Sequence, residues 1–399
     1  MTAHRLNVGP AMRGYSSDIL VRSGLFVAIF LVYSSAMPFA TVAFGIPTTP
    51  AYVAIILIAS ALCSGLFLVR PTLPASKFII AMLGVYLGLI LVQAVFVPLA
   101  TQDILKSRIM WAVVTAAAIV VLQNARERDL VWSMRLVVGF SVLVLLLEYG
   151  SRFSLPVKMS TVVGRAAGLY MNPNIAAFFL CAAMPLVTLR ATVVVRLFWY
   201  IIIGVATQLT FSRGGMLLWA SMLVVVEAFS PTASRSKSHG LRLLILVIFA
   251  VAIYASYAFV VQNAQSILAS SLDSNTSNRL RFGVNDSSKI RIYIIQRAIE
   301  AAQSSIIFGR GIGYAYSWDE GLSVHNMFVL VLLEQGIVGL IWFAALFFAI
   351  FSVRAPFGIW LAAVMVVTGM FNHNLFDSPT YGLVIALYAA LPSVSWDSA

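Results

Sequence analysis

The sequence predicts an all-α polytopic integral membrane protein with about twelve transmembrane helices. Of its 399 residues, 61% are apolar and only 10% are charged, whereas a soluble domain carries about 25% charged residues. The mean hydropathy is +0.96. The apolar residues form continuous runs of about 20, the length that an α-helix needs to cross a bilayer. A transmembrane β-barrel would show alternating segments of about ten residues instead. The composition therefore excludes a soluble enzyme, and the run length excludes a barrel.

Breaks at proline, glycine and charge clusters divide the chain into its predicted spans. These spans are residues 23–44, 51–69, 77–98, 108–124, 130–149, 174–190, 194–210, 214–229, 241–262, 326–352, 356–372 and 376–392. The predicted organisation has three parts. Residues 1–262 hold nine spans joined by short loops and by an outer loop at 150–173. Residues 263–323 form a large, partly helical periplasmic loop or cap, and residues 324–399 hold the last three spans and a short cytoplasmic tail.

Basic residues near the ends of the spans predict the orientation, because short cytoplasmic loops are rich in Lys and Arg. With the amino terminus inside, the basic short loops at residues 70–77, 125–129 and 190–196 fall on the cytoplasmic side. Both termini are therefore expected in the cytoplasm.

The net charge of +12 comes from 26 Lys and Arg against 14 Asp and Glu. These residues flank apolar runs, so the expected partners are membrane lipids or a phosphate-bearing substrate, and not nucleic acid. Several lie on the two long outer segments, against the usual bias: Arg152, Lys158, Arg165, Arg279, Arg281, Lys289, Arg291, Arg297 and Arg310. They either reach outer-leaflet headgroups, or a few of them converge on a phosphate or diphosphate, for which arginine offers forked donors.

His325 is the first candidate for chemistry, because it lies where the long outer segment meets an apolar run. An imidazole at a helix start near the water interface can accept a proton from a sugar hydroxyl near neutral pH. The alternative interpretation is a histidine that caps the helix by bonding to its backbone.

Arg213 is the second candidate, in Thr-Phe-Ser-Arg-Gly-Gly between two apolar runs at the outer surface. The glycines allow close approach to a ligand, and Ser212 and the following helix start add donors for an anion. The alternative is an arginine that ends a transmembrane helix.

The segment from Lys289 to Gln303 predicts an amphipathic helix, because its Ile and Ala residues recur at helical spacing. Arg291 lies off that apolar stripe and is either a substrate contact or a solvated charge. The glycines of residues 309–313 follow no strand, so they predict a turn that closes this helix and not a nucleotide-binding loop. Asn172-Pro173-Asn174 precedes a span and is expected to cap it, with a sugar contact as a further possibility.

Some signatures of other functions are missing. Glu148, Glu227 and Glu334 fall near predicted span ends, whereas ion-coupled carriers bury ionisable groups near the bilayer midplane. A carrier is thus less favoured than an enzyme. Clustered carboxylates for a divalent metal are also missing from the sequence.

Taken in order, these motifs resemble the O-antigen ligase family of the bacterial inner membrane. The resemblance is carried by Gly164-Arg165 to Asn172-Pro173-Asn174, residues 210–215, Lys289-Ile290-Arg291, the glycines of 309–313, His325-Asn326 and the run Glu334-Gln335-Gly336-Ile337-Val338-Gly339-Leu340. It is clearest over residues 164–343.

The resemblance implies a GT-C-like glycosyltransferase that needs no metal or cofactor. Such an enzyme passes O-antigen polysaccharide from undecaprenyl diphosphate to a sugar of lipid A-core on the periplasmic side, which completes lipopolysaccharide. It implies that His325 is the catalytic residue and that Arg213 and Arg291 bind the donor diphosphate. Possible further substrate contacts are Arg165, Asn172, Asn174, Ser212 and Asn326.

Three alternatives to a ligase remain. O-antigen polymerases share these motifs and have a similar length, so they are the main alternative. Protein O-oligosaccharyltransferases tend to carry a larger carboxy-terminal region. A carrier of lipid-linked sugars would explain the basic outer surface without any reaction.

Overall fold

The structure is a computed structural model that confirms the all-α class. Every regular element among the residues it describes is a helix or a short 3-10 turn. The described residues are 15–46, 74–96, 102–123, 125–151, 159–162, 164–229, 286–318, 324–353 and 355–391. The helices and 3-10 turns are α1 (Tyr15–Tyr33), α2 (Ala36–Phe44), α4 (Pro74–Phe96), α5 (Gln102–Leu122), α6 (Glu127–Gly150), η1 (Gly168–Tyr170), α7 (Pro173–Val187), α8 (Val193–Leu209), α9 (Arg213–Phe229), α12 (Asp286–Gln303), α13 (Tyr314–Ser317), α14 (Met327–Phe351), α15 (Phe357–Phe371), η2 (Asn374–Phe376) and α16 (Pro379–Ala390).

Within the described residues, each predicted span coincides with a helix or a bent helix pair. In the part of the chain that the structure describes, four helices are long and apolar enough to cross a membrane: α4, α5, α6 and α14. The bent pair of α1 and α2 makes a fifth candidate, and α7, α8, α15 and α16 are shorter apolar helices. These lengths fit an α-helical membrane protein. The spans predicted at 51–69 and 241–262 lie outside the described residues, so the total of twelve stays a prediction.

The first span differs from its prediction because it is broken. The axes of α1 and α2 meet at 62°, and the break falls at Ser34 and Ser35. Ser34 donates its hydroxyl to the carbonyl of Phe30, and Ser35 adopts a left-handed conformation with φ of 57°. Serine side chains that bond to nearby backbone compete with the helical ladder. Hydropathy alone does not detect such a break.

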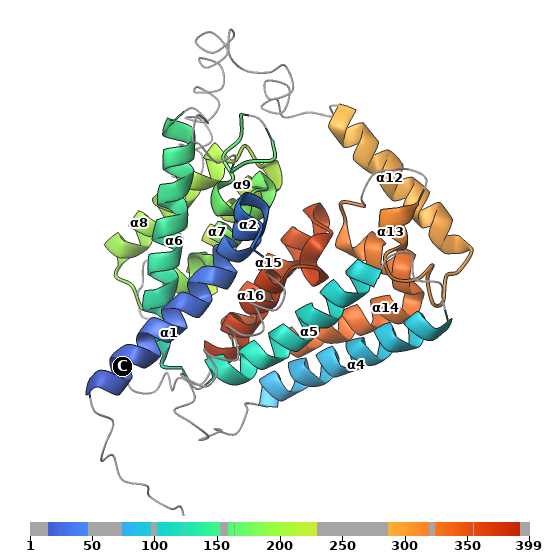
Figure 1. Ribbon diagram of the computed structural model, residues 1–399, viewed down its shortest axis with the longest axis horizontal. Helices are drawn as coiled ribbons and strands as arrows, with labels where there is room; N and C mark the ends of the chain where they lie inside the picture. The colour runs from blue at the N-terminus through green and yellow to red at the C-terminus, as the bar shows by residue number, and fades with distance from the viewer. Residues whose placement is uncertain are drawn as a thin grey trace, which may run out of the picture.

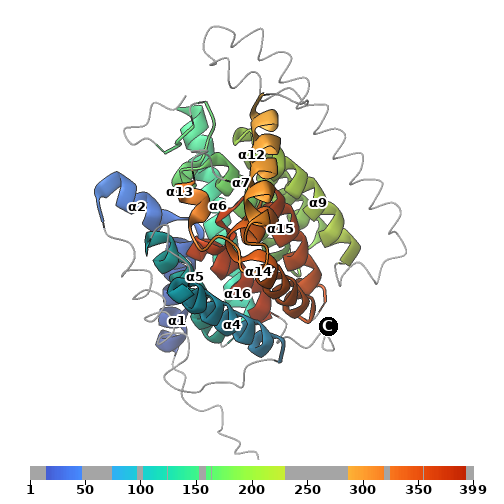
Figure 2. The ribbon, with the colours of Figure 1, turned by 90° about the vertical axis from the view of Figure 1, so that its right-hand side faces the viewer.

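The helices form two groups that meet at a central pair (Figure 1). On one side α1 packs against α6, and α7 packs against α8 and α9. On the other side α4 packs against α5 and α14. Between them stand α15 and α16, where α16 packs closely on α5 and α15 packs on α9 and α14 (Figures 1 and 2). This central position brings loops from both groups together at one end of the bundle.

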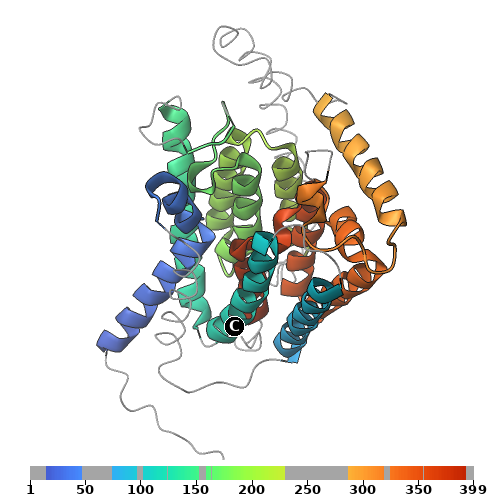
Figure 3. The same cartoon turned by 45° about the vertical axis from the view of Figure 1, so that its right-hand side comes forward.

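The predicted cap at 263–323 is partly described. The amphipathic helix of the prediction is α12, and its stripe of Ile294, Ala298 and Ala302 is buried. The stripe packs α12 on α14, at the edge of the molecule (Figure 3). Ile290, which shares the predicted stripe, is 48% exposed. Residues 263–285 lie outside the described part of the chain.

Candidate active site

A kink in α14 organises one wall of the candidate site. Gly336 has φ of 64° and ψ of −156°, a conformation that breaks the helical path after two turns. Only glycine adopts this region readily. The freed carbonyls of Leu333 and Glu334 accept hydrogen bonds from the N–H groups of Arg310 at 2.8 Å and Gly311 at 3.0 Å.

The glycine segment of residues 309–313 is a turn that follows α12, as predicted, and the structure shows that it docks on this kink. Gly309, Gly311 and Gly313 all have positive φ. A Cβ on Gly309 would overlap the backbone of Glu334, and one on Gly336 would overlap the carbonyl of Ile307. Gly309 and Gly336 therefore both allow the backbone of the turn and the backbone of α14 to approach each other closely.

A buried ion cluster lies beneath the kink and joins three segments. The carboxylate of Glu334 in α14 pairs with Arg108 of α5 at 2.6 Å. The Nε of Arg108 also donates to Asp377, which precedes α16, at 2.9 Å. Arg108 is 1% exposed and Glu334 is 0% exposed. Charges this deeply buried need a partner, because desolvation of an unpaired ion is costly. The Oε1 atom of Glu334 also accepts from the N–H of Gly313 at 3.1 Å.

The sequence-based prediction that Glu334 lies near the end of a span is wrong. Glu334 is eight residues into α14 and fully buried, and not at the end of a span. Glu148 and Glu227 do lie near the ends of α6 and α9 and are buried as well. Glu148 accepts from the N–H groups of Ala167 and Gly168. Glu227 accepts from the hydroxyl of Tyr200 at 2.8 Å. All three acids therefore have partners within the fold.

The ion cluster continues to two histidines through Tyr316 of α13. The hydroxyl of Tyr316 donates to Asp377 Oδ2 at 2.6 Å. Its ring lies 5.9 Å from the ring of His373, which in turn lies 5.1 Å from the ring of His325 in an edge-on contact. Burial and the Asp377 carboxylate raise the pKa of Tyr316, so its hydroxyl keeps the proton that it donates.

The surroundings of both histidines lower their pKa values and so favour the neutral imidazole. Partial burial and the positive charge of Arg291 lower the pKa of His325 below its ordinary value. Burial and then the neighbouring His325 lower the pKa of His373 to about 4. A neutral imidazole has one nitrogen that accepts a proton. The cap interpretation of His325 is not supported, because the N-cap of α14 is Asn326, whose side chain accepts from Val329 N at 3.1 Å.

The two predicted donor-binding arginines occupy different helix starts. Arg291 lies in the first turns of α12, and its charge reaches His325. Arg213 is the first residue of α9. A Cβ on the adjacent Gly214 would lie 3.0 Å from the ring of Phe371, two residues before His373. The start of α9 is thus packed against the segment that carries His373.

Arg165 and Asn174 form a bridge that fixes the loop before α9. The Nε of Arg165 donates to the carbonyl of Thr210 at 2.7 Å, and its Nη2 donates to Asn174 Oδ1 at 2.9 Å. Arg165 is only 2% exposed. The Arg165 guanidinium therefore stabilises the turn at Thr210–Arg213 through the carbonyl of Thr210.

The other predicted contacts have structural roles at helix starts. Asn172 caps α7 by accepting from Asn174 N at 2.9 Å, which confirms the predicted cap. Ser212 accepts from Gly215 N at 3.2 Å. Gly215 also allows α9 to approach α7, because a Cβ there would overlap Ala177. Their contacts with substrate stay predictions.

Sequence reasoning missed Arg108, Asp377 and Tyr316 as parts of this site. A signal existed for Arg108, which falls at the first position of the predicted span 108–124. An ionisable residue within a span usually marks a functional or paired site. The only sequence signal for His373 is that Asn374 follows it, as Asn326 follows His325. Asp377 and Tyr316 carry no local pattern. The packing of α16 against α5 brings Asp377 to Arg108, and the hydrogen bond from Tyr316 to Asp377 adds Tyr316.

Residues 197–344 match the family model described as O-antigen ligase. Over these residues, the match supports the resemblance to the O-antigen ligase family that the motifs predicted. It covers α8, α9, α12, α13 and much of α14, and it includes Arg213, Arg291, His325 and Glu334. No curated protein was found to match the chain.

Proposed function

From the O-antigen ligase match over residues 197–344, we propose that the protein transfers O-antigen polysaccharide from undecaprenyl diphosphate to a sugar hydroxyl of lipid A-core. In this proposal it is a multi-pass enzyme of the bacterial inner membrane with a GT-C-like fold. Its active site faces the periplasm, and the reaction completes lipopolysaccharide without a metal.

One observation carries the proposal: within the matched segment, the charge of Arg291 acts on His325 and lowers its pKa. A neutral His325 can take a proton, and Arg291 is close enough to depress its pKa. A base for a hydroxyl and a cation for a diphosphate are the two groups that this transfer needs.

The reaction balances with these residues alone. The acceptor hydroxyl oxygen attacks the anomeric carbon of the donor glycan, and His325 takes the hydroxyl proton. The bond from that carbon to the diphosphate oxygen breaks, and undecaprenyl diphosphate leaves with the electron pair. Arg213 and Arg291 hold the diphosphate and offset its growing charge with paired N–H donors. Positioning and charge stabilisation supply much of the catalysis.

His373 acts as a positioning residue in this scheme. The ring of His373 packs edge-on against the ring of His325. It also contacts the ring of Tyr316, whose hydroxyl donates a hydrogen bond to Asp377. Asp377 is held by Arg108. The orientation of His325 therefore depends on a chain of contacts that reaches into the bundle.

A polymerase is the second candidate, because the same family includes enzymes that extend the lipid-linked glycan. A deletion strain separates the two. With a ligase, lipid A-core loses all polymer while polymer still accumulates on the carrier lipid. A polymerase deletion leaves a single repeat on lipid A-core instead. The alternative of a carrier is tested with the protein reconstituted in vesicles. Turnover of the lipid-linked donor without its net transport across the membrane would identify an enzyme.

A further inference from the structure

A groove lies between the start of α1 and the start of α6, away from the candidate active site. It has a volume of about 420 Å³ and is lined by Arg22, Ser23, Phe26, Arg128, Asp129, Trp132 and Leu136. The beginnings of α1 and α6 lie at the lower left of Figure 1, whereas α12 and α13 lie toward the upper right. None of the lining residues belongs to the proposed transfer site.

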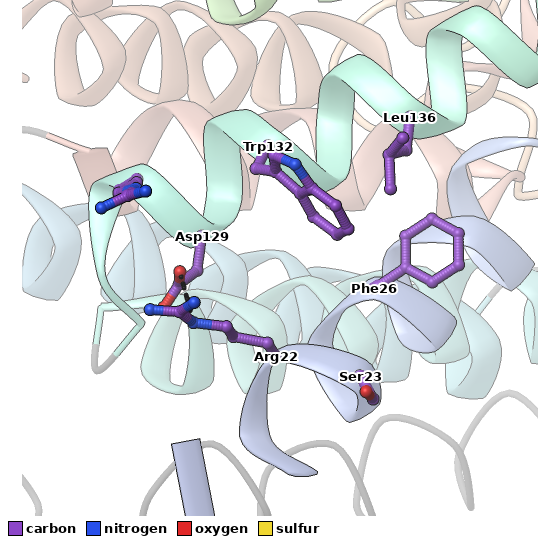
Figure 4. A pocket seen from close by; sticks show the side chains of 7 residues that line it. Arg22, Ser23, Phe26, Asp129, Trp132 and Leu136 are labelled. Carbon is purple, nitrogen blue, oxygen red and sulfur yellow. Dashed lines mark ion pairs between the residues drawn. The ribbon is translucent and has the colours of Figure 1, made fainter. Parts of the chain in front are cut away.

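The polar end of the groove has an excess of positive charge. Arg22 pairs with Asp129 through its Nε at 3.1 Å, yet 44% of its side chain remains exposed. Figure 4 shows this pair at one end of the groove. Arg128, the neighbour of Asp129, is exposed and adds a second guanidinium. Two arginines against one carboxylate leave a net positive charge, which favours an anion.

The other end of the groove is apolar and aromatic. Phe26 and Trp132 face each other with ring centroids 6.3 Å apart in an edge-on contact (Figure 4). Trp132 is 54% exposed and Leu136 is 41% exposed. The apolar surface continues along the two helices, where Phe30 packs edge-on against Phe140 at 5.1 Å. Exposed tryptophan beside arginine is typical of the level of lipid headgroups.

We propose that this groove binds an anionic phospholipid. The phosphate lies between Arg22 and Arg128, and an acyl chain runs along Phe26, Trp132 and Leu136. A free phosphate ion would use the arginines but not the apolar floor. A zwitterionic lipid would use the floor, but its own cation offsets the phosphate charge. Only an anionic lipid matches both halves. By the predicted orientation, it comes from the cytoplasmic leaflet, whose anionic lipids attract basic side chains.

The test titrates the purified full chain with phosphatidylglycerol in mixed micelles and counts bound lipid by native mass spectrometry. The key variant is Arg128→Gln, because Arg22→Gln would also leave Asp129 buried without its partner. We expect Arg128→Gln to bind about fivefold more weakly, the factor for one basic residue at a membrane surface. Trp132→Ala should also weaken binding.

Matched controls separate the groove from general surface effects. Arg126→Gln removes the same charge two residues away, outside the groove, and should leave binding unchanged. Leu143→Ala removes an exposed apolar side chain of the same helix and should also have no effect. Equal losses for Arg126→Gln and Arg128→Gln would overturn the proposal in favour of diffuse charge. Equal binding of phosphatidylcholine, or full competition by inorganic phosphate, would overturn it too.

Discussion

Replacement of Gly336 by alanine tests whether the kink of α14 builds the site. The added Cβ would overlap the carbonyl oxygen of Ile307 and lie 2.6 Å from the N–H nitrogen of Gly309. Both neighbours are backbone atoms, so no side-chain rotation relieves the contact. Either α14 straightens, or the turn at residues 309–313 moves away. Each result displaces the segment between α12 and α14.

The magnitude follows from two contributions. A non-glycine residue in this φ/ψ region costs about 1–3 kcal/mol. Displacement of the turn also breaks the hydrogen bonds from Arg310 N to Leu333 O and from Gly311 N to Glu334 O, at about 0.5–1.5 kcal/mol each. We therefore expect Gly336→Ala to lower the free energy of unfolding by roughly 2–6 kcal/mol.

The assay is unfolding by titration with sodium dodecyl sulfate from a mild detergent, followed by helix content, together with transfer activity. Gly84→Ala and Gly88→Ala in α4 are matched controls, because nothing lies within 4 Å of a Cβ at either position. These controls should lose no stability. If Gly336→Ala were as stable and as active as the controls, the kink would not organise the site.

Three further predictions concern the charged groups. Arg213→Ala and Arg291→Ala should each abolish transfer while expression and folding are kept. Lysine at either position should restore little activity, because it lacks the planar fork that matches phosphate oxygens. Near-normal transfer by both alanine variants would show that these arginines contact lipid headgroups and not the donor diphosphate. Arg108→Met should destabilise the protein by about 3–5 kcal/mol, because it leaves Glu334 buried without its partner. The double variant Arg108→Met/Glu334→Gln should recover much of that loss, and simple additivity of the two changes in unfolding free energy would contradict the pairing. The transfer rate should decrease as the pH falls through the pKa of His325, because a protonated ring accepts no proton. Since burial and Arg291 lower that pKa, the loss should begin below the ordinary histidine value of about 6.5. A pH–rate profile that is flat down to pH 4 would exclude His325 as the base.

Local patterns in the sequence predicted most of the helices, because each span is a continuous apolar run bounded by polar residues, proline or glycine. The amphipathic stripe of α12 was equally visible, since Ile294, Ala298 and Ala302 repeat at helical spacing. The cap at Asn172 followed from its short polar side chain before a proline. In each case, the signal lies within one turn or one helix.

The features that the sequence did not reveal depend on contacts between distant segments. Arg108 and Asp377 are 269 residues apart and meet only because α16 packs on α5. The conformation of Gly336 is required by a turn that begins near Ile307, and hydropathy does not detect backbone approach. The sequence singled out Arg213, Arg291 and His325, and the resemblance implied their roles, but neither identified the residues that pack against His325.

In the proposed reaction, His325 acts on the acceptor hydroxyl while Arg213 and Arg291 hold the donor. The most direct measurement compares His325→Ala with the unaltered protein in transfer to purified lipid A-core, with binding of the undecaprenyl-diphosphate-linked donor measured in parallel. We expect a loss of transfer of about 10²–10⁴-fold, or more if His325 also positions the acceptor, with donor binding largely unchanged and no effect of EDTA on either protein. Undiminished transfer by His325→Ala would exclude His325 as the base.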